Sequence, residues 1–293
     1  MRVEIKLNFS GKEVIMKKKI NSAWLYLIVT ATAVIMGYPL LWLFLAAFKE
    51  NTEIFTSVSL LPKSFTLQGF ISGWKSTAAI PFSVFLMNSC KMVVPTVLLT
   101  LLSASLVAYG FSRFEFRGKK LLFTVMLSTM MLPNTVIMIP RYILFNRFGW
   151  LNSYIPFYIM AAMASNPFFT YLLVQFFRGI PTTLDEAAYM DGAGKWQILI
   201  KIILPLAKAP IVSALLFQTV WTWNDFFNPL LYIDRVKSYP VSLGLRLAID
   251  ADSAVNWNSI IAMTCVSLLP VIILFLCMQK YFVQGIATTG MKN

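Results

Sequence analysis

The sequence predicts an all-α, polytopic membrane protein with six transmembrane helices. Of its 293 residues, 58% are hydrophobic and 13% are charged, and the mean hydropathy is +0.71. Soluble domains are typically about half apolar and about a quarter charged, so this composition is typical of an integral membrane protein. Six apolar runs each exceed the ~20 residues that an α-helix needs to cross ~30 Å of hydrocarbon. Because the bilayer core holds no water to pair with the backbone, each run is expected to be helical.

The chain is expected to have three parts: a polar N-terminal segment (1–21), the transmembrane domain (22–283) and a short tail (284–293). The six runs lie at about 24–48, 82–111, 121–144, 154–177, 206–233 and 259–282. Several runs contain proline, which predicts kinked helices that enclose a cavity. These residues are Pro39, Pro95, Pro133, Pro140, Pro167, Pro229 and Pro270.

The distribution of basic residues predicts the orientation of the chain. Most of the 25 Lys and Arg residues lie in segment 1–21, in residues 112–120, in the loop after the fourth run and in the tail. Loops rich in Lys and Arg stay in the cytoplasm, so both termini and the polar loop 181–205 are expected there. Segment 1–21 is too long and too charged for the first region of a signal peptide.

Loop 181–205 reads PTTLDEAAYMDGAGKWQILIKIILP. The spacing of Thr183 and Glu186 is that of a capping box, and Gly192 stands where a left-handed C-cap would follow. We therefore predict a short helix over 184–191, a sharp turn, and a second helix that ends at Pro205. Two adjacent alanines, Ala187 and Ala188, are expected to leave one face of the short helix bare, so that another protein can approach its backbone.

The same letters resemble the EAA loop of ABC importer permeases. The match comprises Glu186-Ala187-Ala188, Gly192, and then Ile202, Leu204 and Pro205. In that family the loop is cytoplasmic, and its first helix fits into a cleft of the ATP-hydrolysing subunit. The resemblance implies a type I ABC importer permease fold with a coupling helix. The ATPase-coupling residues that it implies are Thr183, Glu186, Ala187, Ala188, Tyr189, Met190, Asp191 and Gly192. Glu186 either caps its own helix only or also meets a polar or basic group of the ATPase.

Further stretches resemble one branch of that family, the MalG-type carbohydrate permeases. They read LLPKSFTLQGF, FLMNS, FSRFEFRGKK, MLPNTVIMIPRY, WNDF and QKYFVQG, and they cover nearly the whole chain from Ser22 onward. The resemblance implies a bacterial cytoplasmic (inner) membrane protein that pairs with a second, homologous permease. It also implies two ATP-binding-cassette subunits, an extracytoplasmic solute-binding protein and a saccharide that crosses the lipid bilayer by alternating access.

The sequence argues against chemistry on this chain. It has no G-x-x-x-x-G-K-[ST] phosphate loop, because GAGKW at Gly192 lacks both the spacing and the hydroxyl. It has no His, which excludes His-metal sites and Ser-His-Asp triads. Cys90, Cys265 and Cys277 lie in apolar runs and have no metal-binding spacing. We therefore expect no catalytic residue, no metal and no cofactor here, with ATP and Mg²⁺ on the partner ATPase. Despite a net charge of +13, no basic stripe with exposed aromatics indicates nucleic acid.

Polar residues inside the apolar runs are the candidates for the substrate path, because polar groups in hydrocarbon are costly. Arg141 stands where the family usually has an apolar residue. Together with Lys91 it suggests an anionic saccharide such as a uronate oligomer (alginate or pectin fragments), since Arg can bind a carboxylate bidentately. The candidates are Asn88, Lys91, Arg141, Trp221, Trp223, Asn224 and Asp225.

Other readings remain open. Lys91 and Arg141 could extend to the membrane interface, Asp225 could pair with one of them, and the tryptophans could be interface anchors. The cargo could be a solute other than a sugar. A secondary transporter or a membrane enzyme fits less well, because a secondary carrier is expected to show inverted repeats and several mid-membrane carboxylates.

Overall fold

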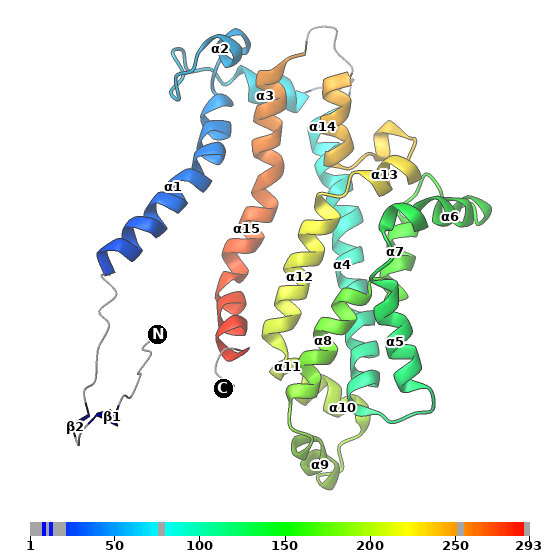
Figure 1. The fold of residues 1–293 in the computed structure, drawn as a ribbon. Coiled ribbons are helices and arrows are strands. Elements are labelled where there is room, and N and C mark those ends of the chain that lie inside the picture. Colours follow the sequence, from blue (N-terminus) through cyan, green and yellow to red (C-terminus); the bar gives the residue numbers. More distant parts are fainter. Residues whose placement is uncertain (1–7, 10–11, 14–21, 76–79, 251–254, 290–293) are drawn as a thin grey trace.

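The computed structural model describes residues 8–9, 12–13, 22–75, 80–250 and 255–289. Its helices form an elongated bundle, with the short helix α9 (Thr183–Met190) protruding at one end and α2 and α3 at the other (Figure 1). Apart from a two-stranded hairpin, β1 (Asn8–Phe9) and β2 (Lys12–Glu13), the regular structure of the described residues is helical, which confirms the all-α prediction.

Helix α1 (Ser22–Ala46) comes first. The short helices α2 (Asn51–Thr56) and α3 (Gln68–Lys75) follow it, and the long α4 (Phe82–Arg113) comes next. The remaining helices are α5 (Lys119–Thr129), α6 (Asn134–Arg147), α7 (Ile155–Ala162), α8 (Pro167–Gly179), α10 (Lys195–Ile198), α11 (Leu204–Leu206), α12 (Lys208–Trp223), α13 (Phe227–Tyr232), α14 (Val241–Asp250) and α15 (Trp257–Thr289). A π-helical stretch (Leu199–Ile203) joins α10 to α11, and a 3₁₀ turn (Val236–Ser238) precedes α14.

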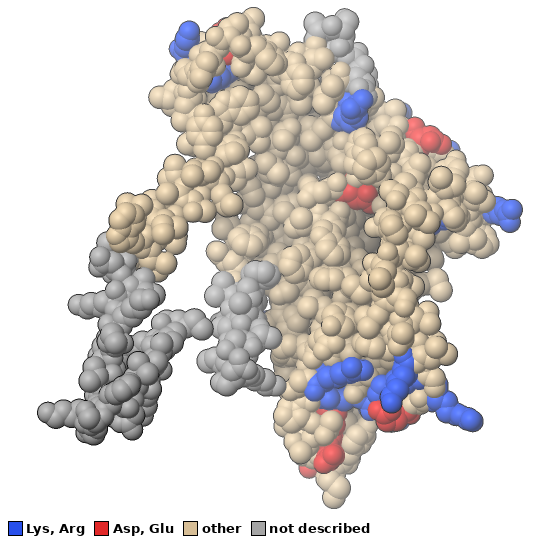
Figure 2. Space-filling view, in the orientation of Figure 1, with Lys and Arg blue, Asp and Glu red and all other residues tan. Residues whose placement is uncertain are grey.

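The six predicted runs correspond to four continuous candidates and two bent ones. Among the described residues, the continuous candidates are Trp24–Ala46, Phe82–Arg113, Ile155–Gly179 and Trp257–Lys280. The two bent pairs are α5 with α6, at 101°, and Lys195–Leu206 with α12, at 78°. The described chain therefore has up to six spans if each bent pair is one span. Figure 2 agrees with membrane insertion, since Lys and Arg gather towards the ends of the molecule and the broad band between them is nearly uncharged.

Three predicted runs are not single helices. In the fourth, α7 ends at Ala162 and α8 starts at Pro167. In the third, α5 stops at Thr129 and α6 starts after Pro133, which has an extended backbone conformation. Proline has no N–H to donate and disfavours a helical conformation in the residue before it, so the helix breaks at this point. In the fifth run, helix α12 ends at Trp223, three non-helical residues follow, and α13 is separate.

Helix α4 lies at the centre of the bundle and packs against α7, α8 and α12, while α15 packs against α12, α3 and α1. A first apolar cluster joins α4 to α8, α9, α10 and the π-helical stretch near the α9 end, and we call it the α9-end cluster. A second cluster lies at the α2–α3 end, and a third lies between the two and includes Trp223 and Tyr232. Helix α1 contributes buried side chains only from Ala46 among its described residues, and Figure 1 shows it diverging from α15.

One buried amide ties the α2–α3 end to α15. The side chain of Asn258, only 4% exposed, donates hydrogen bonds to the backbone carbonyls of Ala47 and Lys49. Gly69 on α3 is pressed against it: a Cβ atom at this position would lie 2.2 Å from Asn258 Oδ1. A side chain at Gly69 therefore requires Asn258 to move and to lose its hydrogen bonds.

We expect Gly69→Ala to destabilise the protein by about 1–3 kcal/mol, because overpacking and a displaced buried amide both cost free energy. The measurement is the thermal unfolding midpoint of the purified protein in detergent. Gly37→Ala on α1 is the matched control, because no atom lies within 4 Å of a Cβ built there. Alanine favours a helix over glycine by ~1 kcal/mol, so the control should be neutral or stabilising. Equal midpoints for the two variants would contradict the close packing of α3 on Asn258.

Candidate functional site

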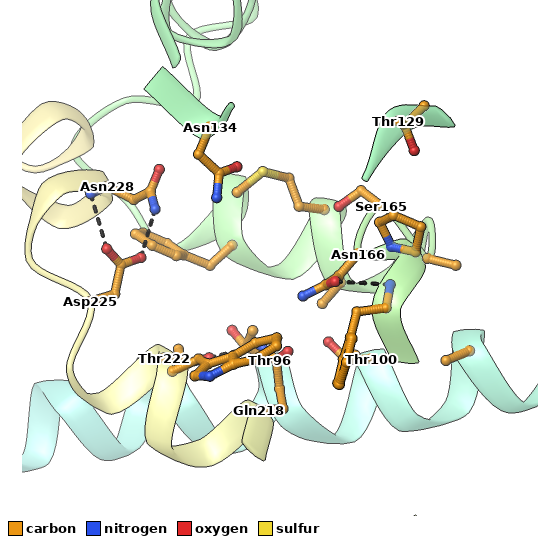
Figure 3. A pocket seen from close by; sticks show the side chains of 18 of the residues that line it. Thr96, Thr100, Thr129, Asn134, Ser165, Asn166, Gln218, Thr222, Asp225 and Asn228 are labelled. Carbon is orange, nitrogen blue, oxygen red and sulfur yellow. Dashed lines mark hydrogen bonds between the residues drawn. The ribbon is translucent and has the colours of Figure 1, made fainter. Parts of the chain in front are cut away.

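A cavity of about 730 Å³ lies where three interruptions of the helices meet (Figure 3). These are the α5–α6 corner, the link between α7 and α8, and the end of α12. Irregular backbone is tolerated within a membrane domain where it is buried in protein or lines a water-filled space. The lining residues are Thr96, Thr100, Ala104, Thr129, Met130, Leu132, Asn134, Ile137, Arg141, Phe157, Met160, Ala161, Ala164, Ser165, Asn166, Pro167, Phe168, Gln218, Trp221, Thr222, Asp225 and Asn228.

The lining combines neutral hydrogen-bonding groups with aromatic surface. Hydroxyl and amide side chains dominate its polar part, and Arg141 and Asp225 are its two charged members. Trp221 adds a large apolar face and packs against Phe168 with ring centroids 5.2 Å apart. Amphipathic aromatic side chains beside hydroxyls and amides suit a ligand that is itself part polar and part apolar.

Gln218 is the most informative residue of this lining. It is only 8% exposed, and its Nε2 donates a 2.8 Å hydrogen bond to Thr222 Oγ1. Its Oε1 atom is buried and accepts no hydrogen bond from the described residues. A buried acceptor without a donor costs free energy. A ligand or water molecule that donates a hydrogen bond to this atom in the cavity would remove that cost.

The charged groups lie at one side of the cavity. Asp225 accepts hydrogen bonds from the backbone and the side chain of Asn228, at 3.2 and 2.8 Å (Figure 3). Arg141 interacts electrostatically with Asp225 and with Tyr232. Arg141, unlike Lys91, lines the cavity together with Asp225, and the pairing of Asp225 with a cation stays a prediction.

Three of the sequence-predicted path residues, Arg141, Trp221 and Asp225, come together in this cavity. Asn88 does not, because its amide donates to the backbone carbonyls of Lys237 and Tyr239, at 2.8 and 3.0 Å, and so holds the loop before α14. Lys91 is exposed on α4 and does not line the cavity either.

Trp223 and Asn224 also lie outside the cavity lining. The indole N–H of Trp223 donates a 3.1 Å hydrogen bond to the carbonyl of Ser267, and its ring is buried between α12 and α15. Trp223 therefore joins two helices and does not reach the cavity. Asn224 is exposed at the C-cap of α12.

Sequence reasoning missed most of the neutral lining. Thr96, Thr100 and Ala104 recur every four residues along α4, and Gln218 and Thr222 have the same spacing on α12. This spacing places each set on one face of its helix. A search for small polar residues at intervals of four within the apolar runs would have found both faces.

The second part of the site is residues 181–205, which we call the coupling segment. As predicted, Gly192 ends its first helix in a left-handed conformation, with φ of +81°. The amides of Gly192 and Ala193 donate to the carbonyls of Tyr189 and Ala188, at 3.0 and 2.9 Å. This is the Schellman arrangement that closes a helix end.

The predicted capping box is wrong. Helix α9 begins at Thr183, its N-cap is Thr182, and no side chain caps it. Thr182 already has a helical backbone conformation, so backbone carbonyls accept from the first amides: those of Leu184, Asp185 and Glu186 donate to Pro181 or Thr182. The reading in which Glu186 only caps its own helix therefore has no support. The second helix, predicted to end at Pro205, continues through the π-helical stretch to Leu206.

The two alanines of the segment face different ways. Ala188 is buried in the α9-end cluster, whereas Ala187 is exposed, so the predicted bare face is supplied by Ala187 without Ala188. Leu184, Tyr189 and Met190 are exposed as well, Met190 to 89%. Thr183, Glu186 and Asp191 lie on the exposed surface of the segment too. A protruding helix with this much exposed apolar surface is typical of a protein–protein contact.

The opposite face of α9 is anchored by an ion pair that sequence reasoning did not find. Asp185 Oδ2 lies 2.7 Å from Arg113 Nε, and the two side chains are 12% and 5% exposed. Burial raises the pKa of the Asp185 carboxyl, and the guanidinium of Arg113 acts in the opposite direction. The pair joins the first turn of α9 to the last turn of α4.

Comparison with known proteins agrees with this architecture. Residues 97–288 match the family of the binding-protein-dependent transport system inner membrane component. The chain is 34% identical to the probable ABC transporter permease protein YurM of Bacillus subtilis, over 93% of this chain and 89% of that protein. It is 29% identical to the trehalose/maltose transport system permease protein MalG of Thermococcus litoralis, over 89% and 93% of the two chains.

A solved structure shares the fold. It is a bacterial ABC transporter involved in the import of the acidic polysaccharide alginate, and its matching chain superimposes with a TM-score of 0.77 at 23% identity. The match covers 89% of this chain and 98% of that one.

The chain belongs to the family of inner membrane components of binding-protein-dependent transport systems. It is a multi-pass membrane protein, and the resemblance to MalG-type permeases is confirmed over 89% of the chain.

Proposed function

We propose that this chain is the membrane-spanning permease subunit of an ATP-driven importer that carries an oligosaccharide by alternating access. The observation that carries the proposal is the cavity at the helix interruptions, which is lined by hydroxyls, amides and an indole and by Gln218, whose Oε1 has no partner among the described residues. A sugar presents hydroxyl donors at its edge and apolar C–H groups on its faces, and this lining complements both.

The cargo class follows from the same lining and from the relatives. MalG of Thermococcus litoralis is named for trehalose and maltose, and the solved neighbour is described as importing an acidic polysaccharide. Arg141 supports an anionic saccharide, because a guanidinium on the cavity wall can bind a carboxylate through two parallel hydrogen bonds. Asp225 lies on the same side of the cavity, and its two oxygens accept hydrogen bonds from Asn228.

The partners follow from the coupling segment and the family. The exposed face of α9, with Leu184, Ala187 and Met190, would dock on an ATP-binding-cassette subunit on the cytoplasmic side. A second homologous permease would complete the pathway, and an extracytoplasmic binding protein would deliver the sugar. ATP and Mg²⁺ would bind the ATPase pair, so this chain would supply movement and a passage and would carry out no chemistry of its own.

The test is reconstitution of the whole complex in vesicles. The tagged chain is purified with whatever binds it, the binding protein is added, and uptake of labelled oligosaccharides is measured with and without ATP. We expect co-purification of an ATPase and a second permease, and uptake that depends on ATP. Uptake of amino acids or peptides without uptake of sugars would replace the cargo assignment. A complex without an ATPase would overturn the proposal itself.

The orientation has its own test. A cysteine introduced at Thr183, which is exposed on α9, is expected to react with a membrane-impermeant maleimide only in inverted vesicles. The variant also carries Ala in place of Cys90, Cys265 and Cys277, so that only the introduced thiol can react. Labelling in intact cells would then place α9 on the wrong side of the membrane for an ATPase contact.

Gln218→Leu should weaken sugar transport while it keeps the side chain volume. Loss of one buried hydrogen-bonding group that a ligand uses costs about 1–3 kcal/mol, so we expect the sugar concentration for half-maximal uptake to rise roughly 5- to 100-fold. Gln175→Leu is the matched control, because Gln175 is exposed on α8 and does not line the cavity. Unchanged half-saturation in Gln218→Leu would show that Oε1 does not meet the cargo.

A further inference from the structure

The cytoplasmic end of α4, as proposed above, holds the near side of the coupling segment through one side chain. Arg113 Nε lies 2.7 Å from Asp185 Oδ2, and Arg113 Nη2 donates a 3.0 Å hydrogen bond to the carbonyl of Ile180. Ile180 ends α8 and Asp185 lies in the first turn of α9. A single guanidinium on α4 therefore fixes the turn between these two helices.

The same end of α4 also holds the far side of the segment. The hydroxyl of Tyr109 donates a 3.0 Å hydrogen bond to the carbonyl of Lys195, the first residue of α10. The ammonium of Lys195 lies 4.8 Å from the centroid of the Phe114 ring, directly after α4. Helix α4 thus contacts the coupling segment at the start of α9 and again at the start of α10, on either side of the Gly192 turn.

Apolar packing also joins α4 to the coupling segment. The α9-end cluster contains Ala104, Ala108 and Tyr109 of α4 together with Ala188 of α9 and Ile198 of α10. Close-packed interiors transmit displacement because they have little room to deform.

A more distant part of α4 forms one wall of the cavity. Thr96 and Thr100 line the cavity on the same continuous helix that ends at Arg113. At 1.5 Å per residue, Thr100 and Arg113 are about 20 Å apart along the axis. No break or loop intervenes, so a tilt of the α4 end moves the cavity wall with it.

Because the ion pair is buried, breaking it costs more free energy than breaking an exposed pair would. The side chains are 5% and 12% exposed, and neither Asp185 Oδ1 nor Arg113 Nε has a hydrogen-bond partner among the described residues, so Nε and Oδ2 are in ionic contact. A buried charge that loses its partner is strongly destabilised, whereas an exposed pair contributes little. The position of α9 on α4 is therefore set by this contact in a way that a surface pair could not achieve.

We propose that Arg113 and Asp185 are a positioning pair that locks the coupling helix to α4, so that movement of α9 reaches the cavity-lining face of α4. This inference rests on the proposed function, because it assigns a task to α9 within ATP-driven transport. Neither residue contacts the cargo or the nucleotide in this arrangement.

The experiment measures two rates in the reconstituted complex: sugar taken up and ATP hydrolysed, both with saturating binding protein. Asp185→Asn keeps the size of the side chain and removes its charge. We expect the complex to assemble and to hydrolyse ATP, with the sugar transported per ATP reduced roughly 2- to 30-fold. Arg113→Asp combined with Asp185→Arg restores the pair in reverse and should recover a higher ratio than Asp185→Arg alone.

Glu115→Gln is the control, because it removes an exposed ion pair with Lys119 at the same end of the molecule. This variant should keep the wild-type ratio. A wild-type ratio in Asp185→Asn, or a swap variant no better than Asp185→Arg alone, overturns the inference. A wild-type complex that shows no ATP-dependent uptake would instead overturn the proposed function, so the two failures are distinguishable.

Discussion

Replacing Gly192 with valine should reduce ATP-driven uptake at least roughly tenfold while the protein still inserts into the membrane. Gly192 has φ of +81°, a conformation in which a β-branched residue is strained by about 1–3 kcal/mol. No atom lies within 4 Å of a Cβ built there, so the effect arises from the backbone and not from a collision. Relief of this strain breaks the hydrogen bonds that end α9 and changes the angle at which its exposed face is presented. The measurements are vesicle uptake and the amount of permease in the membrane.

Two companion variants separate backbone strain from side-chain bulk. Gly194→Val adds the same side chain two residues away, where φ is −77° and the surroundings are equally open. It should transport normally. Gly192→Asn should keep most of its activity, because asparagine tolerates the left-handed conformation. Normal uptake by Gly192→Val would mean that the geometry of this turn does not matter for coupling.

Arg141→Leu should change the selectivity between charged and neutral sugars more than it changes the total rate of uptake. If Arg141 binds a carboxylate, its loss removes a charge-assisted hydrogen bond worth about 1.5–3 kcal/mol. The ratio of uronate to neutral oligosaccharide uptake should then fall roughly 10- to 100-fold. The measurement is competition between labelled charged and neutral oligosaccharides of equal length in the reconstituted complex.

Controls on the same helix make the result specific. Arg147→Leu removes an exposed arginine at the end of α6 that does not line the cavity, and the ratio should not change. Arg141→Lys keeps the charge but loses the planar fork, so an intermediate ratio is expected. An unchanged ratio of uronate to neutral oligosaccharide uptake in Arg141→Leu would show that Arg141 interacts with Asp225 and does not bind the cargo.

The apolar runs and the coupling turn could be predicted because their signals are local. A run of apolar residues long enough to cross a bilayer has few alternatives to a helix. Gly192 followed by a polar turn likewise has a local reason, since few residues adopt a positive φ at low cost. The start of α9 was misjudged because Thr182 adopts a helical backbone conformation, and no spacing rule distinguishes it from Thr183.

The site was harder to predict because it depends on residues far apart in the sequence. Arg113 and Asp185 meet only after α4 and α8 pack together, and neither residue has a local signal for the other. Asn88 looked like a path residue because it is polar in an apolar run, yet loop carbonyls before α14 use its amide. The neutral lining escaped notice because threonine and glutamine attract less attention than charged residues, although their spacing of four was visible.

The divergence of the N-terminal part of α1 from α15 determines what a spectroscopic experiment can report (Figure 1). No residue in the most apolar stretch of Trp24–Ala46 is buried by the rest of the described chain. Among the described residues of α1, only Ala46, at its C-terminal end, is buried. Calorimetry of the purified subunit will therefore measure the unfolding of the helices packed around α4, and α1 will contribute almost nothing to the measured heat. A spin label near Trp24, in contrast, will report only on lipid or on a neighbouring polypeptide, which makes it a direct sensor of assembly.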